Sequence, residues 1–122
     1  MKVFLGGTCP GWDWRKELIP MLQCDYYNPI VENWGEECRL REVYEREICD
    51  YVLYVITEDM EGVYSIAEVV DDSNKKPAKT LFCNFNTNPS LNIISVERML
   101  KSNGVNIFYS LKEIADFLNE RL

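Results

Sequence analysis

The chain contains no histidine. Histidine is the side chain that ordinarily exchanges protons near neutral pH, and it is the commonest ligand of protein-bound metals. Its absence excludes Ser–His and Cys–His nucleophile pairs and counts against a zinc centre. Any acid, base or nucleophile must therefore be a carboxylate, a cysteine, a tyrosine or a lysine.

Positive charge is scarce as well. The 13 Lys and Arg residues stand against 20 Asp and Glu residues, so the formal net charge is −7. Proteins that bind nucleic-acid polymers or anionic membranes neutralise phosphates with clustered basic side chains. The one basic cluster, Lys75 and Lys76 with Lys79, falls in a predicted turn. We expect a small-molecule ligand, and neither a nucleic-acid polymer nor a membrane as partner.

Long apolar runs and paired cysteines are also missing. No run approaches the ~20 apolar residues of a membrane-spanning helix, and the first residues lack the pattern of a signal peptide. The five cysteines (9, 24, 38, 49 and 83) include no Cys-x-x-Cys pair. Their odd number and wide spacing are atypical of a disulfide framework or a metal site. We expect reduced thiols, a cytoplasmic protein, and no metal or cofactor.

Five short apolar runs are present and predict strands. The run Val52–Ile56 is apolar throughout and does not alternate with polar residues, which is typical of parallel strands covered on both faces. The predicted strands are Lys2–Leu5, Cys24–Tyr27, Tyr51–Thr57, Thr80–Phe85 and Val105–Phe108.

Helical patterns separate these strands. Ser110 and Glu113 form a capping box that starts the last helix, and Asn88-Pro89 predicts the start of the helix before it. Pro20 should end or kink the first helix near Ile19. The remaining helices are predicted over Glu36–Ile48 and behind Gly62.

Strict alternation of strands and helices predicts an α/β fold. Right-handed crossovers make it a doubly wound, five-stranded parallel sheet with helices on both faces. The flavodoxin-like strand order 2-1-3-4-5 is expected, within a single domain over residues 1–122. Its switch point lies between the first and third strands, so the loops that follow these strands should face each other and hold the ligand.

Carboxylates gather at that predicted edge. Glu58, Asp59 and Glu61 follow the third strand, and Glu68 lies one to two turns into the next helix. Such a cluster could supply the acid and the nucleophile of a reaction, because crowded carboxylates push each other's pKa values apart. A solvated acidic helix face would give the same pattern without any function.

Other residues at the same edge are candidates for substrate binding. Gly6-Gly7-Thr8 offers approachable backbone amides and a hydroxyl, although a tight strand-to-helix turn would use the same residues. A loop tryptophan either packs under its loop or stacks on a planar ligand. The substrate-binding candidates are Gly6, Gly7, Thr8, Trp12, Asn28, Gly62, Ser65 and Asn84.

An ordered set of short motifs resembles the short branch of the nucleoside 2-deoxyribosyltransferase family. The matching residues run from the first strand to the fourth: Val3-Phe4-Leu5-Gly6-Gly7, Trp14-Arg15, Asn28-Pro29 with Trp34, Cys49-Asp50, and Gly62 through Ser65 to Ala67-Glu68. The last forty residues match in element order only.

The resemblance implies that Glu68 is the nucleophile of an N-glycosidic bond cleavage or base exchange. Glu68 would hold the 2′-deoxyribosyl group of a nucleoside or nucleotide-like substrate as a covalent ester. A second carboxyl group must protonate the departing base, and the crowded carboxylates Glu58, Asp59 and Glu61 are the candidates. The family's aspartate six residues before the nucleophile is replaced here by Gly62. The family also implies a homodimer or higher homo-oligomer, in which a neighbouring subunit completes the pocket.

Two other functions remain open from the sequence. One is hydrolysis of deoxynucleoside monophosphates, with the phosphate held by Gly7, Thr8 and Ser65. The other is binding without catalysis, in which the protein senses or sequesters a nucleotide derivative. The replacement of the family aspartate by Gly62 favours this second alternative.

Overall fold

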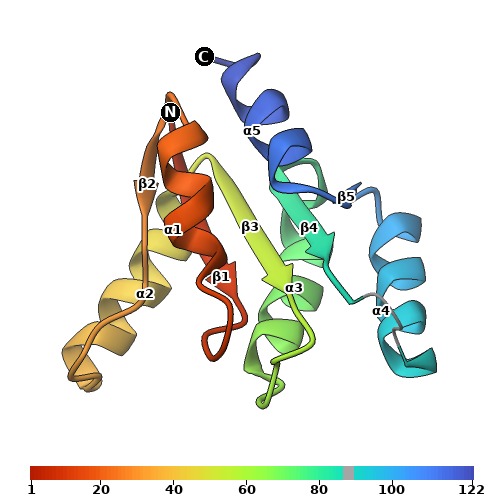
Figure 1. Ribbon diagram of the computed structural model, residues 1–122, viewed down its shortest axis with the longest axis horizontal. Coiled ribbons are helices and arrows are strands. Elements are labelled where there is room, and N and C mark those ends of the chain that lie inside the picture. Colours follow the sequence, from red (N-terminus) through yellow and green to blue (C-terminus); the bar gives the residue numbers. More distant parts are fainter. Residues whose placement is uncertain (87–89) are drawn as a thin grey trace.

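The computed structural model describes residues 1–86 and 90–122 and contains one open parallel sheet (Figure 1). Five strands form it in the order β2-β1-β3-β4-β5, and every neighbouring pair is parallel. The strands are β1 Lys2–Gly7, β2 Asp25–Tyr27, β3 Tyr51–Ile56, β4 Thr80–Asn84 and β5 Asn106–Phe108. The predicted fold class and strand order are confirmed.

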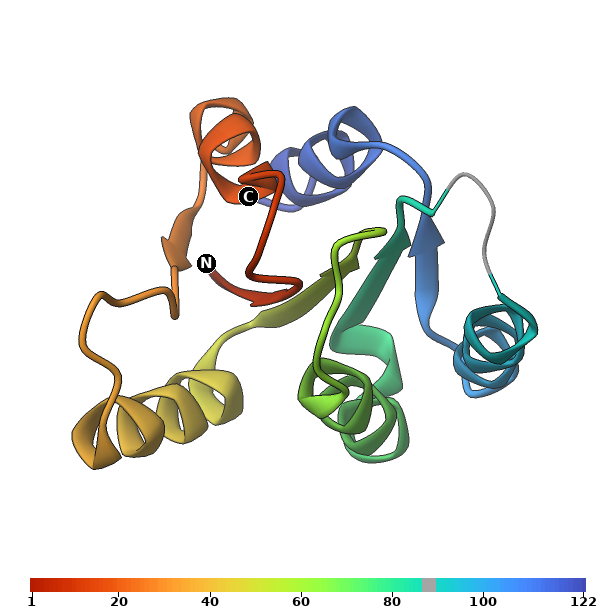
Figure 2. The same ribbon diagram turned by 60° about the horizontal axis from the view of Figure 1, so that its bottom comes forward.

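Helices cover both faces of the sheet (Figure 2). On one face, α1 and α5 pack over alternate strand residues such as Val3, Leu5 and Leu53. On the other face, residues of α3 and α4 pack over Phe4 and Tyr54, and α2 lies on the same side. The helices are α1 Trp14–Leu18, α2 Glu36–Ile48, α3 Tyr64–Lys75, α4 Leu91–Ser102 and α5 Leu111–Asn119, with short 3-10 turns η1 Ile19–Met21 and η2 Pro77–Lys79.

The helix boundaries follow local signals. The first helix changes to a 3-10 turn at Ile19, as Pro20 predicts. The predicted start at Asn88-Pro89 lies outside the described residues, and in the structure Ser90 caps α4 by accepting a hydrogen bond from the Ile93 amide. Side-chain caps of this kind satisfy amides that have no partner within the helix.

The capping box of α5 is present with one change. The Ser110 hydroxyl accepts a hydrogen bond from the Glu113 amide at 3.1 Å. The Glu113 carboxylate accepts from the Tyr109 amide at 2.9 Å, one residue before the amide that the standard motif uses. These two hydrogen bonds fix the backbone on either side of Ser110 and so fix how the chain enters α5.

Two glycines allow β1 to reach the switch point. Gly7 has a φ of +120°, and a Cβ atom there would lie 2.1 Å from the Val55 carbonyl oxygen. A Cβ atom on Gly6 would lie 2.7 Å from the Tyr54 ring. Both positions require glycine for packing alone, but the predicted tight strand-to-helix turn is wrong: Gly6 and Gly7 end β1, and α1 begins only at Trp14. Among the described residues, no helix has the length and apolarity to cross a membrane.

Candidate functional site

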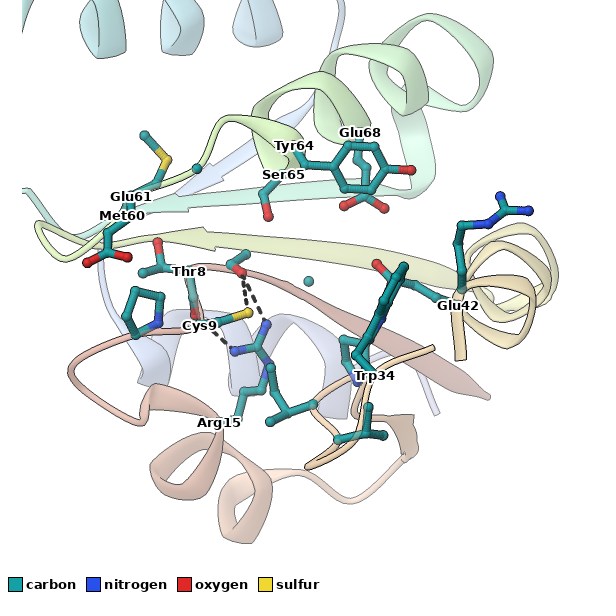
Figure 3. A pocket seen from close by; sticks show the side chains of 18 of the residues that line it. Thr8, Cys9, Arg15, Trp34, Glu42, Met60, Glu61, Tyr64, Ser65 and Glu68 are labelled. Carbon is teal, nitrogen blue, oxygen red and sulfur yellow. Dashed lines mark hydrogen bonds between the residues drawn. The ribbon is translucent and has the colours of Figure 1, made fainter. Parts of the chain in front are cut away.

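A pocket of about 670 Å³ opens at the carboxyl ends of β1 and β3 (Figure 3). We call it the switch-point pocket, because it lies where the strand order reverses. Open α/β sheets bind their ligands at this position. Its lining comes from the end of β1 and the loop after it, Arg15 of α1, the segment between β2 and α2, one face of α2, the loop after β3, and the first half of α3. The lining residues are Gly6, Gly7, Thr8, Cys9, Pro10, Arg15, Pro29, Ile30, Val31, Trp34, Arg39, Glu42, Val43, Met60, Glu61, Gly62, Tyr64, Ser65 and Glu68.

Glu68 forms part of the pocket wall and is only 5% exposed. Burial is the main reason that its pKa is raised to about 7, and the nearby Glu42 carboxylate raises it further. Arg46 acts in the opposite direction, and Asp72 adds a smaller upward contribution. Glu68 is therefore not part of a solvated acidic face, and near neutral pH it exists in both protonation states.

Glu42 projects from α2 on the opposite side of the pocket (Figure 3). Its pKa is also raised, mainly by burial, while the Trp34 side chain and the charges of Arg15 and Arg46 oppose the shift. Figure 3 shows the carboxylates of Glu42 and Glu68 pointing toward one another. Two carboxylates in one partly enclosed site titrate as a pair, so the first ionises more readily than the second.

A hydrogen-bonded cluster supports Glu68 from behind. Arg46 on α2 donates to Asp72 through Nε at 2.9 Å and also bonds Asp71. Its Nε lies 4.0 Å from Oε2 of Glu68, and its Nη2 donates to the Glu68 carbonyl at 3.4 Å. The buried Tyr54 hydroxyl donates to Asp72 at 2.6 Å. This Arg46 cluster ties α2, β3 and α3 together and holds the turn that carries Glu68.

Arg15 forms part of the pocket wall and fixes the loop after β1. Its guanidinium donates to the carbonyls of Leu5, Gly7 and Thr8 at 2.9, 3.3 and 2.9 Å. The Trp14 indole donates to the same Thr8 carbonyl at 3.0 Å. Burial lowers the pKa of Arg15 to about 10, so the side chain remains charged at neutral pH. The role of Arg15 is to hold backbone carbonyls in place.

Five of the predicted substrate-binding residues lie in the pocket lining: Gly6, Gly7, Thr8, Gly62 and Ser65. Thr8 also links the loop after β1 to the end of β3 and the loop after it. Its amide donates to the Val55 carbonyl at 2.8 Å, and its hydroxyl oxygen accepts from the Thr57 amide at 3.0 Å. Thr8 therefore holds β1 and β3 together at the pocket floor.

Two of the three carboxylates predicted as candidate acids lie outside the pocket lining. Glu58 and Asp59 are both exposed. The Asp59 carboxylate accepts a hydrogen bond from the Trp12 amide at 3.2 Å and occupies the space that a Cβ atom on Gly11 would need. It braces the loop after β1 from outside. Glu61, from the same segment, does line the pocket.

Three predicted substrate-binding residues also lie outside the lining, and local contacts explain their positions. The Trp12 ring packs edge-on against Phe85 at 5.0 Å between centroids. The Asn28 side chain accepts from the Ile30 amide at 3.1 Å and closes a turn. The Asn84 side chain accepts from the Asn86 amide at 3.0 Å. Asn and Asp side chains commonly make such bonds to the backbone in turns.

Sequence reasoning missed the contribution of α2. Arg39, Glu42, Val43 and Arg46 follow the i, i+3, i+4, i+7 spacing of one helix face. The first three line the pocket, and the fourth supports Glu68. A helix face that carries charges at this spacing beside a predicted switch point is the signal that could have identified them.

The described residues include no group of three His, Cys, Asp or Glu side chains placed to hold a metal ion. Cys9 lies at the pocket edge, where its thiol contacts the Gly7 carbonyl at 3.7 Å. The chemistry available to the pocket is therefore that of carboxylates with a thiol nearby, between aromatic and aliphatic walls. No protein-family model matches the chain, and the curated proteins include no significant sequence match to it.

Proposed function

We propose that the protein cleaves or exchanges the N-glycosidic bond of a 2′-deoxynucleoside or nucleotide-like substrate, with Glu68 as the nucleophile. The observation that carries the proposal is the placement of Glu68, a buried carboxylate in the wall of the switch-point pocket opposite a second carboxylate. Paired carboxylates are the usual machinery for displacement at an anomeric carbon.

The chemical step uses the ionised form of Glu68. Its carboxylate attacks C1′, the bond from C1′ to the base nitrogen breaks, and the sugar is held as a glutamyl ester. Water or a second base then opens the ester. Glu42, in its protonated form, can deliver a proton to a departing neutral base. Burial raises the pKa of both carboxyl groups, and carboxyl groups that share a site ionise one after the other, so one can act as the acid while the other is the nucleophile.

The walls of the pocket suit a nucleoside. Its volume of about 670 Å³ lies within the ordinary range for small-molecule sites. Trp34 and Tyr64 offer ring faces on which a planar base can stack. Ile30 and Met60 add apolar surface beside them.

Binding without catalysis is the alternative, and one observation favours it. Gly62 lines the pocket where the resembled family has an aspartate, and Glu58 and Asp59 lie elsewhere. If Glu42 cannot act as the acid, the pocket would hold a nucleotide derivative without turning it over. Cleavage of a deoxynucleoside monophosphate, with the phosphate held by Gly7, Thr8 and Ser65, is the second enzymatic alternative.

A mixed incubation separates these possibilities. Purified protein is incubated with a deoxynucleoside, or its monophosphate, and a different free base, and the products are separated by chromatography. Base exchange identifies a transferase, free sugar identifies a hydrolase, and tight binding without products identifies a binding protein. Glu68→Gln should abolish both reactions and the covalent sugar adduct seen by intact mass spectrometry. Glu37→Gln, which changes an exposed carboxylate on α2, is the matched control and should retain both.

We also propose that the protein is a cytoplasmic homodimer or higher homo-oligomer. The five cysteines are present as free thiols, which is typical of a reducing compartment. Trp34 and Tyr64, which line the pocket, and Tyr44 on α2 are large aromatic side chains that remain exposed. Aromatic side chains are enriched where subunits meet.

A further inference from the structure

We infer that the switch-point pocket selects an N-glycoside whose base is a cationic heterocycle over the neutral isostere of the same shape. The inference rests on the proposed function, because it assigns the class of substrate for the same pocket. Three features of the described residues carry it: the charge of the lining, the surroundings of Glu68, and the aromatic walls.

The lining carries more negative than positive charge. Glu42, Glu61 and Glu68 contribute carboxylates, whereas Arg15 and Arg39 contribute the guanidinium groups. Arg39 is already paired, because its Nε and Nη2 atoms donate to the Glu36 carboxylate at 3.0 and 2.7 Å. Arg15 is buried and directs three of its donor groups to backbone carbonyls. A bound cation would therefore meet net negative charge.

Glu68 shares its cationic neighbour with other carboxylates. Arg46 makes its shorter contacts with Asp71, at 2.5 Å, and Asp72, at 2.9 Å, and reaches Oε2 of Glu68 only at 4.0 Å. The groups that act on Glu68 are Glu42 and Arg46 from α2 and Asp72 from its own helix. Behind them, the Tyr54 hydroxyl of β3 donates to Asp72. Charge interactions strengthen in a partly enclosed site, so a cation placed between Glu42 and Glu68 would stabilise both as carboxylates.

Aromatic rings flank this position. Trp34 is 59% exposed and Tyr64 is 63% exposed, although both line the pocket. Figure 3 shows Tyr64 on the α3 side, beside Glu68, and Trp34 across the cavity, beside Glu42. A positive charge over an aromatic face is stabilised by the negative potential of the ring. Aromatic faces next to carboxylates that outnumber the guanidinium groups of the lining favour a flat cation over a neutral ring.

A cationic base also simplifies the reaction. When the Glu68 carboxylate attacks C1′, the electron pair of the breaking C1′–N bond passes to the ring nitrogen and cancels its positive charge. The base leaves as a neutral molecule and needs no proton. Water then opens the glutamyl ester, which releases the sugar and one proton and restores the Glu68 carboxylate. This reaction therefore needs no acid to protonate the base, and Glu58 and Asp59, which lie outside the pocket lining, are not required.

The test compares two ligands that differ in charge. The cation is 2′-deoxyribosyl nicotinamide, and the neutral isostere is the C-glycoside of benzamide with the same sugar, in which carbon replaces the charged nitrogen. Calorimetry at about pH 8, above the pKa of Glu68, should show the cation binding about tenfold more tightly. The preference should shrink as the pH falls through about 7, because the Glu68 carboxylate becomes protonated.

Variants separate the carboxylates from the rest of the site. Glu42→Gln should reduce the preference for the cation over the neutral isostere severalfold. Glu37→Gln, outside the pocket, should leave the preference intact. Equal affinity of the wild-type protein for both ligands at about pH 8, or a preference that does not change with pH, would overturn the inference.

The outcomes also separate this inference from the proposed function. Tight, pH-dependent binding of the cation without any release of nicotinamide would contradict the proposed catalysis and leave the inferred selectivity standing. Turnover of neutral deoxynucleosides at the same kcat/KM as the cation would contradict the selectivity and leave the proposed catalysis standing.

Discussion

At the scale of single residues, Glu68 shows what burial does to a carboxyl group. Its pKa of about 7 lies well above the ordinary value of 4.5. Between these two values the folded protein holds a proton that the unfolded chain has released, so the stability contributed by the protonated group is lost as the pH rises through about 7. The residue best placed for nucleophilic chemistry is therefore one that destabilises the fold when it is charged.

Glu68→Gln should make the protein more stable at about pH 8, by on the order of 2 kcal/mol, because glutamine never takes the buried charge. At about pH 4, where Glu68 is protonated in both states, the gain should vanish. Thermal unfolding of both proteins across this pH range measures the effect. Glu37→Gln should show no pH-dependent gain. Parallel curves for wild type and Glu68→Gln would contradict the assignment of the raised pKa.

Arg46 has the opposite influence on the same carboxylate, since its charge lowers the pKa of Glu68. Arg46→Met should raise that pKa further above 7. It should also destabilise the fold by about 3 kcal/mol, because the buried Asp72 loses its partner. Carboxyl NMR titration gives the pKa, and denaturant unfolding gives the stability. Arg46→Lys keeps the positive charge, so it should bring both the pKa of Glu68 and the free energy of unfolding part of the way back to their wild-type values. An unchanged Glu68 titration in Arg46→Met would show that the 4.0 Å contact has no electrostatic consequence.

At the scale of elements, the join between β1 and β3 depends on the conformation of one glycine. Gly7→Ala would place a methyl group 2.1 Å from the Val55 carbonyl oxygen at a φ of +120°, so the strands must separate or the backbone must rotate. We expect a loss of about 3 kcal/mol or more in the free energy of unfolding. Gly62→Ala is the matched control, because a methyl group at that position would meet no atom within 4 Å. Equal stability of the two variants would contradict this account.

The elements that could be predicted from the sequence are those whose signals are local. The continuous apolar run of β3, the helix over Glu36–Ile48 and the break at Pro20 each depend on neighbours within a few residues. The strand order was predicted as the arrangement typical of a doubly wound sheet of this size, since right-handed crossovers fix only the hand of each connection. Leu122 marks the limit of such patterns. It follows the buried Leu118 of α5 by four residues, the spacing of one helix face, but it is exposed, because α5 ends at Asn119.

The candidate site was only partly predictable, because its side chains depend on contacts between distant segments. Topology alone was enough to place Glu68 beside Gly7 and Thr8 at the switch point. The direction of Asp59, by contrast, is decided by the Trp12 amide, 47 positions away. The contribution of Glu42 depends on how α2 lies across the sheet, and no local pattern encodes that.

At the scale of the whole molecule, one helix leaves an apolar stripe uncovered. Leu40, Tyr44 and Ile48 recur every four residues along α2, which places them on one face, and all three are exposed. Tyr64 is exposed at the pocket, which Val43 of the same helix also lines. A stable protein–protein interface buries roughly 1,200–2,000 Å² in total. The stripe and the pocket edge together supply large apolar side chains suited to the centre of such an interface.

We therefore expect light scattering at micromolar concentration to give a mass of at least twice the 14.3 kDa of one chain. Tyr44→Glu should shift the protein toward the monomer, because a charge at the centre of an apolar interface loses its hydration without gaining a partner. Leu91→Glu alters an equally apolar, exposed position on α4 and should leave the mass unchanged. If the wild-type mass stays near 14.3 kDa at all concentrations, the pocket is built from one chain. Trp34 and Tyr64 are then exposed to the ligand and not to a second subunit.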